Sequence, residues 1–175
     1  KKGFHASIDA VFLAAFAPLR GKMKVLDAGC GVGAAGLCLQ ARVPDMTLTG
    51  IDTQQDLVDL ALQNAALNGI ADRCCFFSGD IRRDKNIPDN SFTTVIVNPP
   101  YYEAGAHTPS PHAIKAAAHG EDATLTDWVK YAHKKLKQGG DLVMVHRADR
   151  LEDIVTALTA RRWFGSLVIC PLFSY

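Results

Sequence analysis

A glycine-rich turn between an apolar strand and a helix is the feature that most constrains the fold of this chain. The segment Asp27-Ala28-Gly29-Cys30-Gly31-Val32-Gly33 follows an apolar stretch at 24–28 and precedes a helix-favouring stretch at 34–41. Glycines at such a turn allow a ligand to approach the main chain closely, and the N-terminus of the following helix favours electron-rich groups. The turn therefore predicts a β-α unit with a ligand site at the carboxyl end of its strand.

Strands and helices alternate along the rest of the chain. The pattern predicts strands at 24–28, 46–51, 74–78, 93–97, 141–145 and 166–172, and helices at 10–17, 34–41, 55–68, 125–137 and 151–160. We expect Asp9 to cap the first helix and Pro18 to close it. Such alternation indicates an α/β fold with a Rossmann-like, doubly wound, mostly parallel sheet and helices on both faces. We expect a single domain, 1–175, with an N-terminal helical segment (1–22) and a Rossmann-like core (23–175).

Composition agrees with one globular domain. The chain has 175 residues, of which 48% are apolar and 21% charged, enough to bury a core. Its net charge of +1 makes no strong electrostatic case for nucleic acid over the chain as a whole. No apolar run approaches the roughly 18 residues that cross a bilayer, so we expect no membrane contact. The five cysteines form no CxxC pair and are predicted to be reduced thiols of a cytoplasmic protein.

Three acidic residues, Asp27, Asp52 and Asp80, lie where three expected strands end. The spacing Gly29-x-Gly31-x-x-Ala34 also fits a dinucleotide-binding fingerprint. A pyrophosphate would be repelled by the extra carboxylate of Asp27, whereas the ammonium and sulfonium charges of S-adenosylmethionine would be attracted. We therefore predict S-adenosylmethionine, with Asp52 on the ribose hydroxyls and Asp80 on the adenine amino group. The alternative, three turn residues that happen to be acidic, is disfavoured by their shared position.

A proline pair stops the expected strand at 93–97 and leaves the corner Asn98-Pro99-Pro100-Tyr101. The Asn98 side-chain carbonyl and the Pro99 main-chain carbonyl can converge on an NH2 group, and Tyr101 can stack on the flat group that carries it. These acceptors would return lone-pair density to the nitrogen as it attacks a methyl group. The predicted catalytic residues are Asn98, Pro99, Pro100 and Tyr101; the predicted cofactor-binding residues are Asp27, Gly29, Gly31, Gly33, Asp52, Asp80, Ile81 and Asn98.

With these motifs in view, the chain resembles the class I S-adenosylmethionine-dependent methyltransferases over nearly its whole length. Its Asn-Pro-Pro-Tyr motif is similar to that of enzymes that methylate adenine N6 in nucleic acids or glutamine side chains in release factors. It resembles most the tRNA-valine adenine-N6 methyltransferase family, although Ser7-Ile8 stands where that family has Gly-Thr. The shared features are Gly3-Phe4, residues 9–13, residues 98–102, Gly105, Thr108-Pro109 and the helix that begins at Leu125.

The resemblance implies transfer of a methyl group from S-adenosyl-L-methionine to adenine N6 in RNA, above all tRNA, with S-adenosyl-L-homocysteine as product and no metal. The substrate base must be extruded or lie in a loop. Two groups of basic residues can contact RNA or simply form a solvated surface: Lys130, Lys134, Lys135 and Lys137 on one helix face, and Arg82, Arg83 and Lys85 near the ligand edge. The histidines at 107, 112 and 119 match no standard metal spacing.

Three other functions remain as alternatives. A protein glutamine N5-methyltransferase would use the same corner. A small-molecule O-methyltransferase would require a base or metal beside the acceptor. A non-catalytic RNA-binding module would not need the three acids. We also expect a lid or disordered segment at 103–123, with a short helix at 114–118. An unpaired strand at 166–172 would leave an exposed apolar edge, so we expect the natural chain to continue past Tyr175 with the last strand of the sheet.

Overall fold

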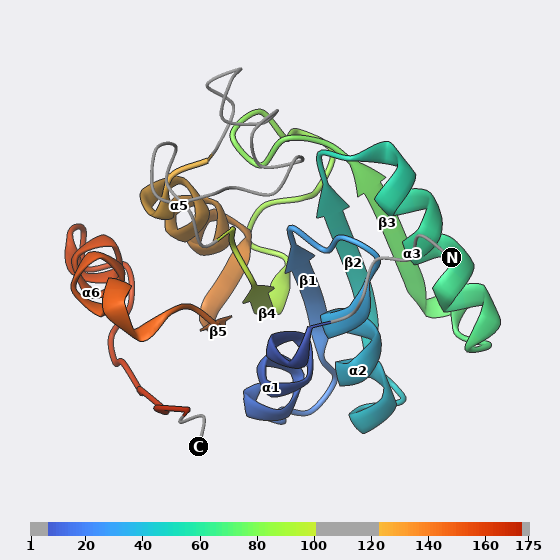
Figure 1. The fold of residues 1–175 in the computed structure, drawn as a ribbon, viewed down its shortest axis with the longest axis horizontal. Helices are drawn as coiled ribbons and strands as arrows, with labels where there is room; N and C mark the ends of the chain where they lie inside the picture. The colour runs from blue at the N-terminus through green and yellow to red at the C-terminus, as the bar shows by residue number, and fades with distance from the viewer. Residues whose placement is uncertain (1–6, 101–122, 173–175) are drawn as a thin grey trace.

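A computed structural model describes residues 7–100 and 123–172, which contain a five-stranded parallel sheet (Figure 1). The spatial order of the strands is β3-β2-β1-β4-β5. Their bounds are Lys24–Ala28 (β1), Thr47–Asp52 (β2), Cys74–Ser78 (β3), Phe92–Val97 (β4) and Leu136–Met144 (β5). The chain moves outward from β1 in one direction and then restarts at β4 on the other side. This order confirms the predicted Rossmann-like fold and makes the carboxyl end of β1 and β4 the switch point where ligands of such sheets bind.

Helices cover both faces of the sheet (Figure 1). One face packs against α1 (Ile8–Phe16), α2 (Ala34–Arg42) and α3 (Gln55–Leu67), and the other packs against α5 (Leu125–Lys135), which also contacts α6 (Leu151–Thr159). Two short 3-10 turns lie at Ala71–Arg73 and Ala148–Arg150.

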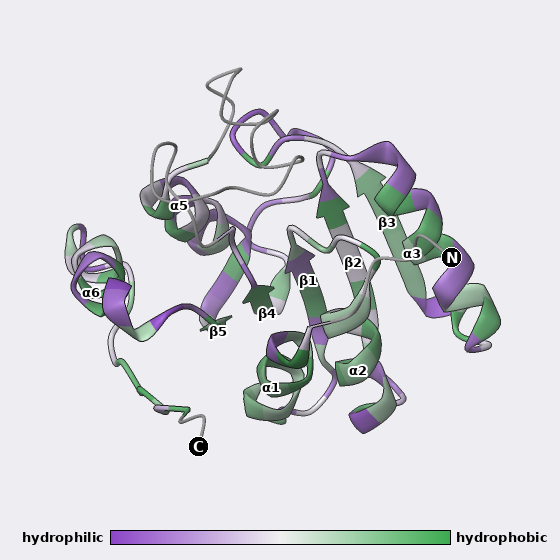
Figure 2. Cartoon of the chain, viewed as in Figure 1, coloured by the Kyte–Doolittle hydropathy of each residue, from purple (hydrophilic) through white to green (hydrophobic). Residues whose placement is uncertain are grey.

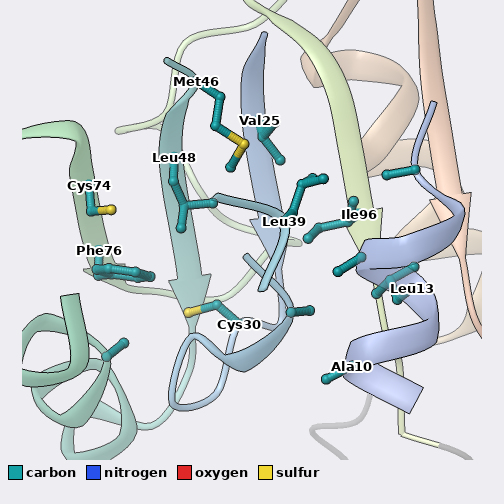
Figure 3. Packing of buried hydrophobic residues seen from close by; sticks show 14 of the residues in the cluster. Ala10, Leu13, Val25, Cys30, Leu39, Met46, Leu48, Cys74, Phe76 and Ile96 are labelled. Atoms are coloured by element: carbon teal, nitrogen blue, oxygen red, sulfur yellow. The ribbon is translucent and has the colours of Figure 1, made fainter. Parts of the chain in front are cut away.

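Alternate residues of each strand supply the two cores. Val25 and Ile96 face the first core with Leu13 and Leu39 (Figure 3), whereas Leu26 faces the α5 side. Burial on both faces is what a parallel sheet requires of its strands.

The first helix begins earlier than predicted. Its N-cap is Ser7, whose backbone is extended, and Asp9 lies inside the first turn. The prediction that Asp9 caps the helix is therefore wrong, because Ile8 already has helical geometry. The helix ends at Phe16, two residues before Pro18, in agreement with the predicted stop.

The fifth strand also begins earlier than its predicted start at residue 141. Helix α5 ends at Lys135, and β5 follows at once from Leu136, whose side chain is buried. Its pairing with β4 shifts register, with Phe92 opposite Leu136 but Thr94 opposite Asp141. Residues 137–140 therefore form an irregularity, and the two glycines in it do not mark the start of the strand.

The predicted sixth strand does not form. Residues 166–172 have no regular secondary structure, and no strand of the described residues pairs with them. An extended segment becomes a strand only by exchanging main-chain hydrogen bonds with a neighbour. Val168 is 75% exposed, and Figure 2 shows this C-terminal stretch as largely hydrophobic.

None of the helices in the described part of the chain is long and apolar enough to span a membrane.

Gly50 in the middle of β2 provides a test of the packing. A methyl group there would lie 2.8 Å from Phe76 Cε1 and 2.9 Å from Cys30 Sγ, both of which are buried. We expect Gly50→Ala to lower the free energy of unfolding by about 2 kcal/mol, as overpacking of a core does. Gly21→Ala, where nothing lies within 4 Å, is the control. Urea denaturation measures both, and equal midpoints for Gly50→Ala and the parent would contradict the packing.

Candidate functional site at the carboxyl edge of the sheet

The glycine turn folds over the end of the neighbouring strand. Gly29, Gly31 and Gly33 all have positive φ, between 51° and 82°, which glycine adopts without steric cost. The amides of Gly29 and Cys30 both donate to the carbonyl of Ile51, at 2.8 and 3.0 Å. A Cβ added at Gly31 would meet nothing within 4 Å. The turn is therefore fixed in position by β2 and open to a ligand at Gly31.

Asp52 lies beside this opening. Its Oδ2 accepts a hydrogen bond from the Gly31 amide at 2.8 Å, and its Oδ1 accepts one from the Gln54 amide at 3.0 Å. The side chain is only partly buried, and each carboxylate oxygen keeps further acceptor capacity. The arrangement presents a fixed carboxylate that can accept hydrogen bonds from a pair of hydroxyl groups, and the ribose contact of Asp52 stays a prediction.

Asp80 follows β3 at the same edge. The Gly79 amide donates to the Asp52 carbonyl at 2.8 Å, which brings the two acidic residues into one neighbourhood. The Arg82 guanidinium forms a bidentate ion pair with Asp80, at 3.0 and 2.6 Å, and this hydrogen bonding lowers the pKa of the carboxyl group below its usual value. Arg82 therefore holds Asp80 in this structure. A phosphate contact by Arg82, as predicted, would compete with this ion pair. Ile81 is buried in the core on the α5 side.

Asp27 is buried beneath the turn. Its side chain is 2% exposed, and Oδ2 accepts from the Gly36 amide at 3.0 Å. Its pKa is raised to about 7, chiefly by burial; the hydrogen bond from the Gly36 amide opposes this rise, and the Asp52 charge adds to it. The carboxylate is part of the packing of α2 on β1, and direct contact with a cofactor stays a prediction.

The register of β1 and β4 brings the two motifs together. Ala28 pairs with Val97, so the next residues along the two strands, Gly29 and Asn98, lie at neighbouring positions of the edge. Asn98 is partly buried, Pro99 is buried and Pro100 is exposed. Tyr101 lies outside the described residues, as do residues 103–122 of the predicted lid, with its short helix at 114–118 and its histidines.

Trp128 of α5 contacts the glycine turn, although it is not among the residues predicted for the site. Its ring packs against Gly29, where an added Cβ would lie 2.9 Å from Cη2, so it backs the glycine turn. Its indole Nε1 is buried and makes no hydrogen bond in the described part of the structure. An aromatic residue at a buried helix position gives no sequence signal for this contact.

Lys135 does not belong to an exposed basic face, contrary to prediction. Its side chain is 0% exposed, and Nζ lies 2.8 Å from Asp84 Oδ2 and 3.0 Å from Asp89 Oδ1. Lys134 is exposed and lies 3.3 Å from Asp89. The error arose because the last turn of α5 is covered by the acidic segment before β4, which periodicity along the helix does not reveal.

The sequence of this chain is similar to those of known methyltransferases. The sequence profile of the family described as "Methyltransferase small domain" matches residues 7–157. A tRNA1(Val) (adenine(37)-N6)-methyltransferase of Porphyromonas gingivalis is 30% identical over 132 residues, which is 74% of this chain and 51% of that protein. A release factor glutamine methyltransferase of Salmonella typhimurium is 28% identical over 158 residues, 84% of this chain and 54% of that protein. The chain thus spans about half the length of these curated relatives.

Among solved structures, a predicted O-methyltransferase from Agrobacterium tumefaciens superposes with a TM-score of 0.69. It is 24% identical in sequence, and the match covers 87% of this chain and 68% of that one. At this level of identity the likeness concerns the fold, and it agrees with the parallel sheet described above.

The pKa of Asp27 predicts how stability depends on pH. A carboxyl group with a pKa of about 7 when folded and an ordinary value of 3.8 binds its proton more tightly in the folded state. The parent protein should therefore lose stability as pH rises from about 4 to about 7. Asp27→Asn keeps an acceptor for Gly36 but cannot ionise, so its advantage over the parent should grow by on the order of 4 kcal/mol. Unfolding free energies across this range test it, with exposed Asp45→Asn as control; a constant difference for Asp27→Asn would contradict it.

Proposed function

The chain belongs to the methyltransferase small-domain family, and from this premise we propose that it methylates the exocyclic N6 of adenine in RNA, above all in tRNA, with S-adenosylmethionine as methyl donor. The observation that carries the proposal is the β1–β4 register, which sets the glycine turn next to the Asn98 corner. A cofactor lying on the turn would then be adjacent to an acceptor group held at the corner, and such proximity is a major part of the catalysis of group transfer.

The residues at the edge suit this cofactor. Gly31 leaves open space for a ligand against the main chain, and Asp52 presents acceptors for a ribose diol. Asp80 offers acceptors for an adenine amino group, shared with Arg82. When bound, the cofactor supplies a methyl group activated by a sulfonium charge, and S-adenosylhomocysteine is the product. Residues that would hold it are Asp27, Gly29, Gly31, Gly33, Asp52, Asp80, Ile81 and Asn98.

The corner would bind and orient the acceptor nitrogen. The Asn98 side-chain carbonyl and the Pro99 carbonyl would each accept a hydrogen bond from one N–H of the acceptor group. These hydrogen bonds would localise lone-pair density on the nitrogen and select an NH2 group. The nitrogen becomes acidic as it is alkylated, so its extra proton can leave to water or a nearby carbonyl without a dedicated base. Tyr101 is proposed to stack on the base.

An RNA substrate is supported by the tRNA-modifying relative and by the chemistry of the corner. A base stacked in a helix cannot reach the end of β4, so the adenine would be extruded or already unpaired. Exposed Arg83 and Lys85 follow the Asp80 turn and can meet phosphates there. A tRNA substrate also implies a cytoplasmic protein.

Glutamine methylation is the second candidate, because the release factor enzyme is similar over 84% of this chain. The same pair of acceptors would hold the amide NH2 of a glutamine. Labelled S-adenosylmethionine offered with total tRNA or with release factor protein discriminates the two: labelled N6-methyladenosine supports the first function and labelled methylglutamine the second.

Asn98→Ala tests the role of the corner. We expect methyl transfer to fall by a factor of about 100 or more, because a transition-state acceptor is removed. The affinity for S-adenosylmethionine, measured by calorimetry, should change much less than the transfer rate, because Asn98 is only one of the residues that would hold the cofactor. Asn86→Ala, which alters an amide in the loop before β4, is the control and should keep normal turnover. Normal turnover of Asn98→Ala on a substrate that the parent methylates would refute the assignment.

A further inference from the structure

A buried lysine ties the segment between β3 and β4 to the last turn of α5. Lys135 Nζ contacts the carboxylates of Asp84 and Asp89 and donates to the main-chain carbonyl of Ile87, while its side chain is 0% exposed. The Tyr131 hydroxyl, one turn earlier, donates to Asp84 Oδ2 at 3.1 Å. One ammonium group therefore gathers three acceptors from a single segment of the chain.

The segment joining β3 to β4, residues 79–91, contains turns but no helix or strand, so contacts outside it must define its path. The amides of Asn90 and Ser91 donate to the carbonyls of Lys134 and Lys135, at 3.0 and 2.9 Å. Asp84 Oδ1 accepts from the Asn86 amide at 2.9 Å. The latter half of the segment is thus bound to the end of α5 by main-chain and side-chain contacts together.

The first half of the same segment carries the acid predicted to hold the adenine amino group. The Gly79 amide is bound to the Asp52 carbonyl of β2, and the Arg83 amide donates to the Asp80 carbonyl at 2.9 Å. The turn bearing Asp80 and Ile81 is therefore held at one end by β2 and, directly after Arg83, by Asp84 at the other. Loss of the Asp84 contact would release one of these two ends.

We infer that Lys135 is a positioning residue for the cofactor site, acting through Asp84 on the turn that carries Asp80 and Ile81. The inference rests on the proposed function, since it concerns the affinity for S-adenosylmethionine. A fully buried ion pair is costly in desolvation and is a weak source of stability by itself, whereas its geometry specifies where two segments meet. In the described part of the chain, the polar partners of the Lys135 ammonium group are Asp84, Ile87 and Asp89, none of which is a predicted site residue. Its removal should therefore act on binding and not on the transfer step.

The charge balance around Asp84 makes the effect depend on pH. Burial raises the pKa of Asp84, but hydrogen bonds from Lys135 and from two amides outweigh it and hold the pKa below its usual value. Without Lys135, Asp84 would keep the Asn86 and Ile87 amides and the Tyr131 hydroxyl as donors. It would also lie near the Asp89 carboxylate, which itself pairs with Lys134. Asp84 should then keep its proton to higher pH, and its ionisation should displace the segment toward water.

Lys135→Met removes the ammonium while conserving much of the side chain's volume. We expect it to weaken S-adenosylmethionine binding about tenfold at about pH 8 and less at about pH 5, because a larger fraction of Asp84 carries a proton at the lower pH once Lys135 is absent. The kcat of this variant for methyl transfer, measured at saturating cofactor, should equal that of the parent. Lys134→Met is the matched control, because this neighbour is exposed and its ammonium forms an ion pair with Asp89. The affinity of this variant for S-adenosylmethionine should equal that of the parent at both pH values.

A double variant, Lys135→Met with Asp84→Asn, keeps the test decisive where the single variant folds poorly. It leaves no unpaired charge at position 84, so we expect a smaller loss of affinity relative to the parent, and the same loss at both pH values. Calorimetric titrations of parent, control, single and double variants, with thermal melting to confirm folding, supply the readout. Parent-like affinity of folded Lys135→Met at both pH values, or an equal loss in Lys134→Met, overturns the inference. Failure of the parent to bind S-adenosylmethionine instead overturns the proposed function.

Discussion

Parallel pairing of β1 with β4 is the interaction on which the site depends. Both strands are buried on two faces, and their register aligns Val25 with Thr94 and Ala28 with Val97. A shift of one residue would turn the apolar side chains of one strand toward the wrong core, so the packing of the sheet enforces the register. The same register makes Gly29 and Asn98 neighbours, although about 70 residues separate them in the sequence. The chemistry of the edge is therefore set by the burial of residues that take no part in it.

Helix α5 supports this edge from one face. Trp128 packs behind Gly29, and Lys135, two turns later, holds the segment that follows Asp80. The helix is itself fixed by a capping box in which Thr124 and Asp127 exchange hydrogen bonds. Because the helix runs directly into β5 at Leu136, its position is coupled to the sheet at its C-terminal end. One element thus orients the glycine turn and the acidic turn together, which a loop of the same length could not do as reproducibly.

The sequence allowed the fold to be predicted where local patterns and parallel-sheet geometry agreed. The turn at Gly29, the acids Asp52 and Asp80 and the stop after Val97 lie at one edge, as expected from strand ends. Prediction from the sequence failed where a segment distant in sequence decides whether a strand forms or a side chain is buried. Residues 166–172 have strand composition but no pairing strand among the described residues, and Lys135 follows the pattern of an exposed helix residue but is covered by Asp84 and Asp89. Neither neighbour can be recognised from the pattern of a single segment.

The three acids at the strand ends show why residue type alone does not assign a role. Asp52 is held by two amides beside open space, Asp80 is paired with an arginine, and Asp27 is enclosed beneath α2. Burial makes ionised Asp27 unfavourable, so a nearby positive charge would favour the ionised form and offset part of that cost. A cationic cofactor near the turn would therefore be linked to loss of a proton from Asp27, whereas a neutral ligand in the same place would not. The buried acid can thus contribute to charge selectivity at the edge without a direct contact, because electrostatic interaction in a poorly solvated environment acts beyond hydrogen-bond distance.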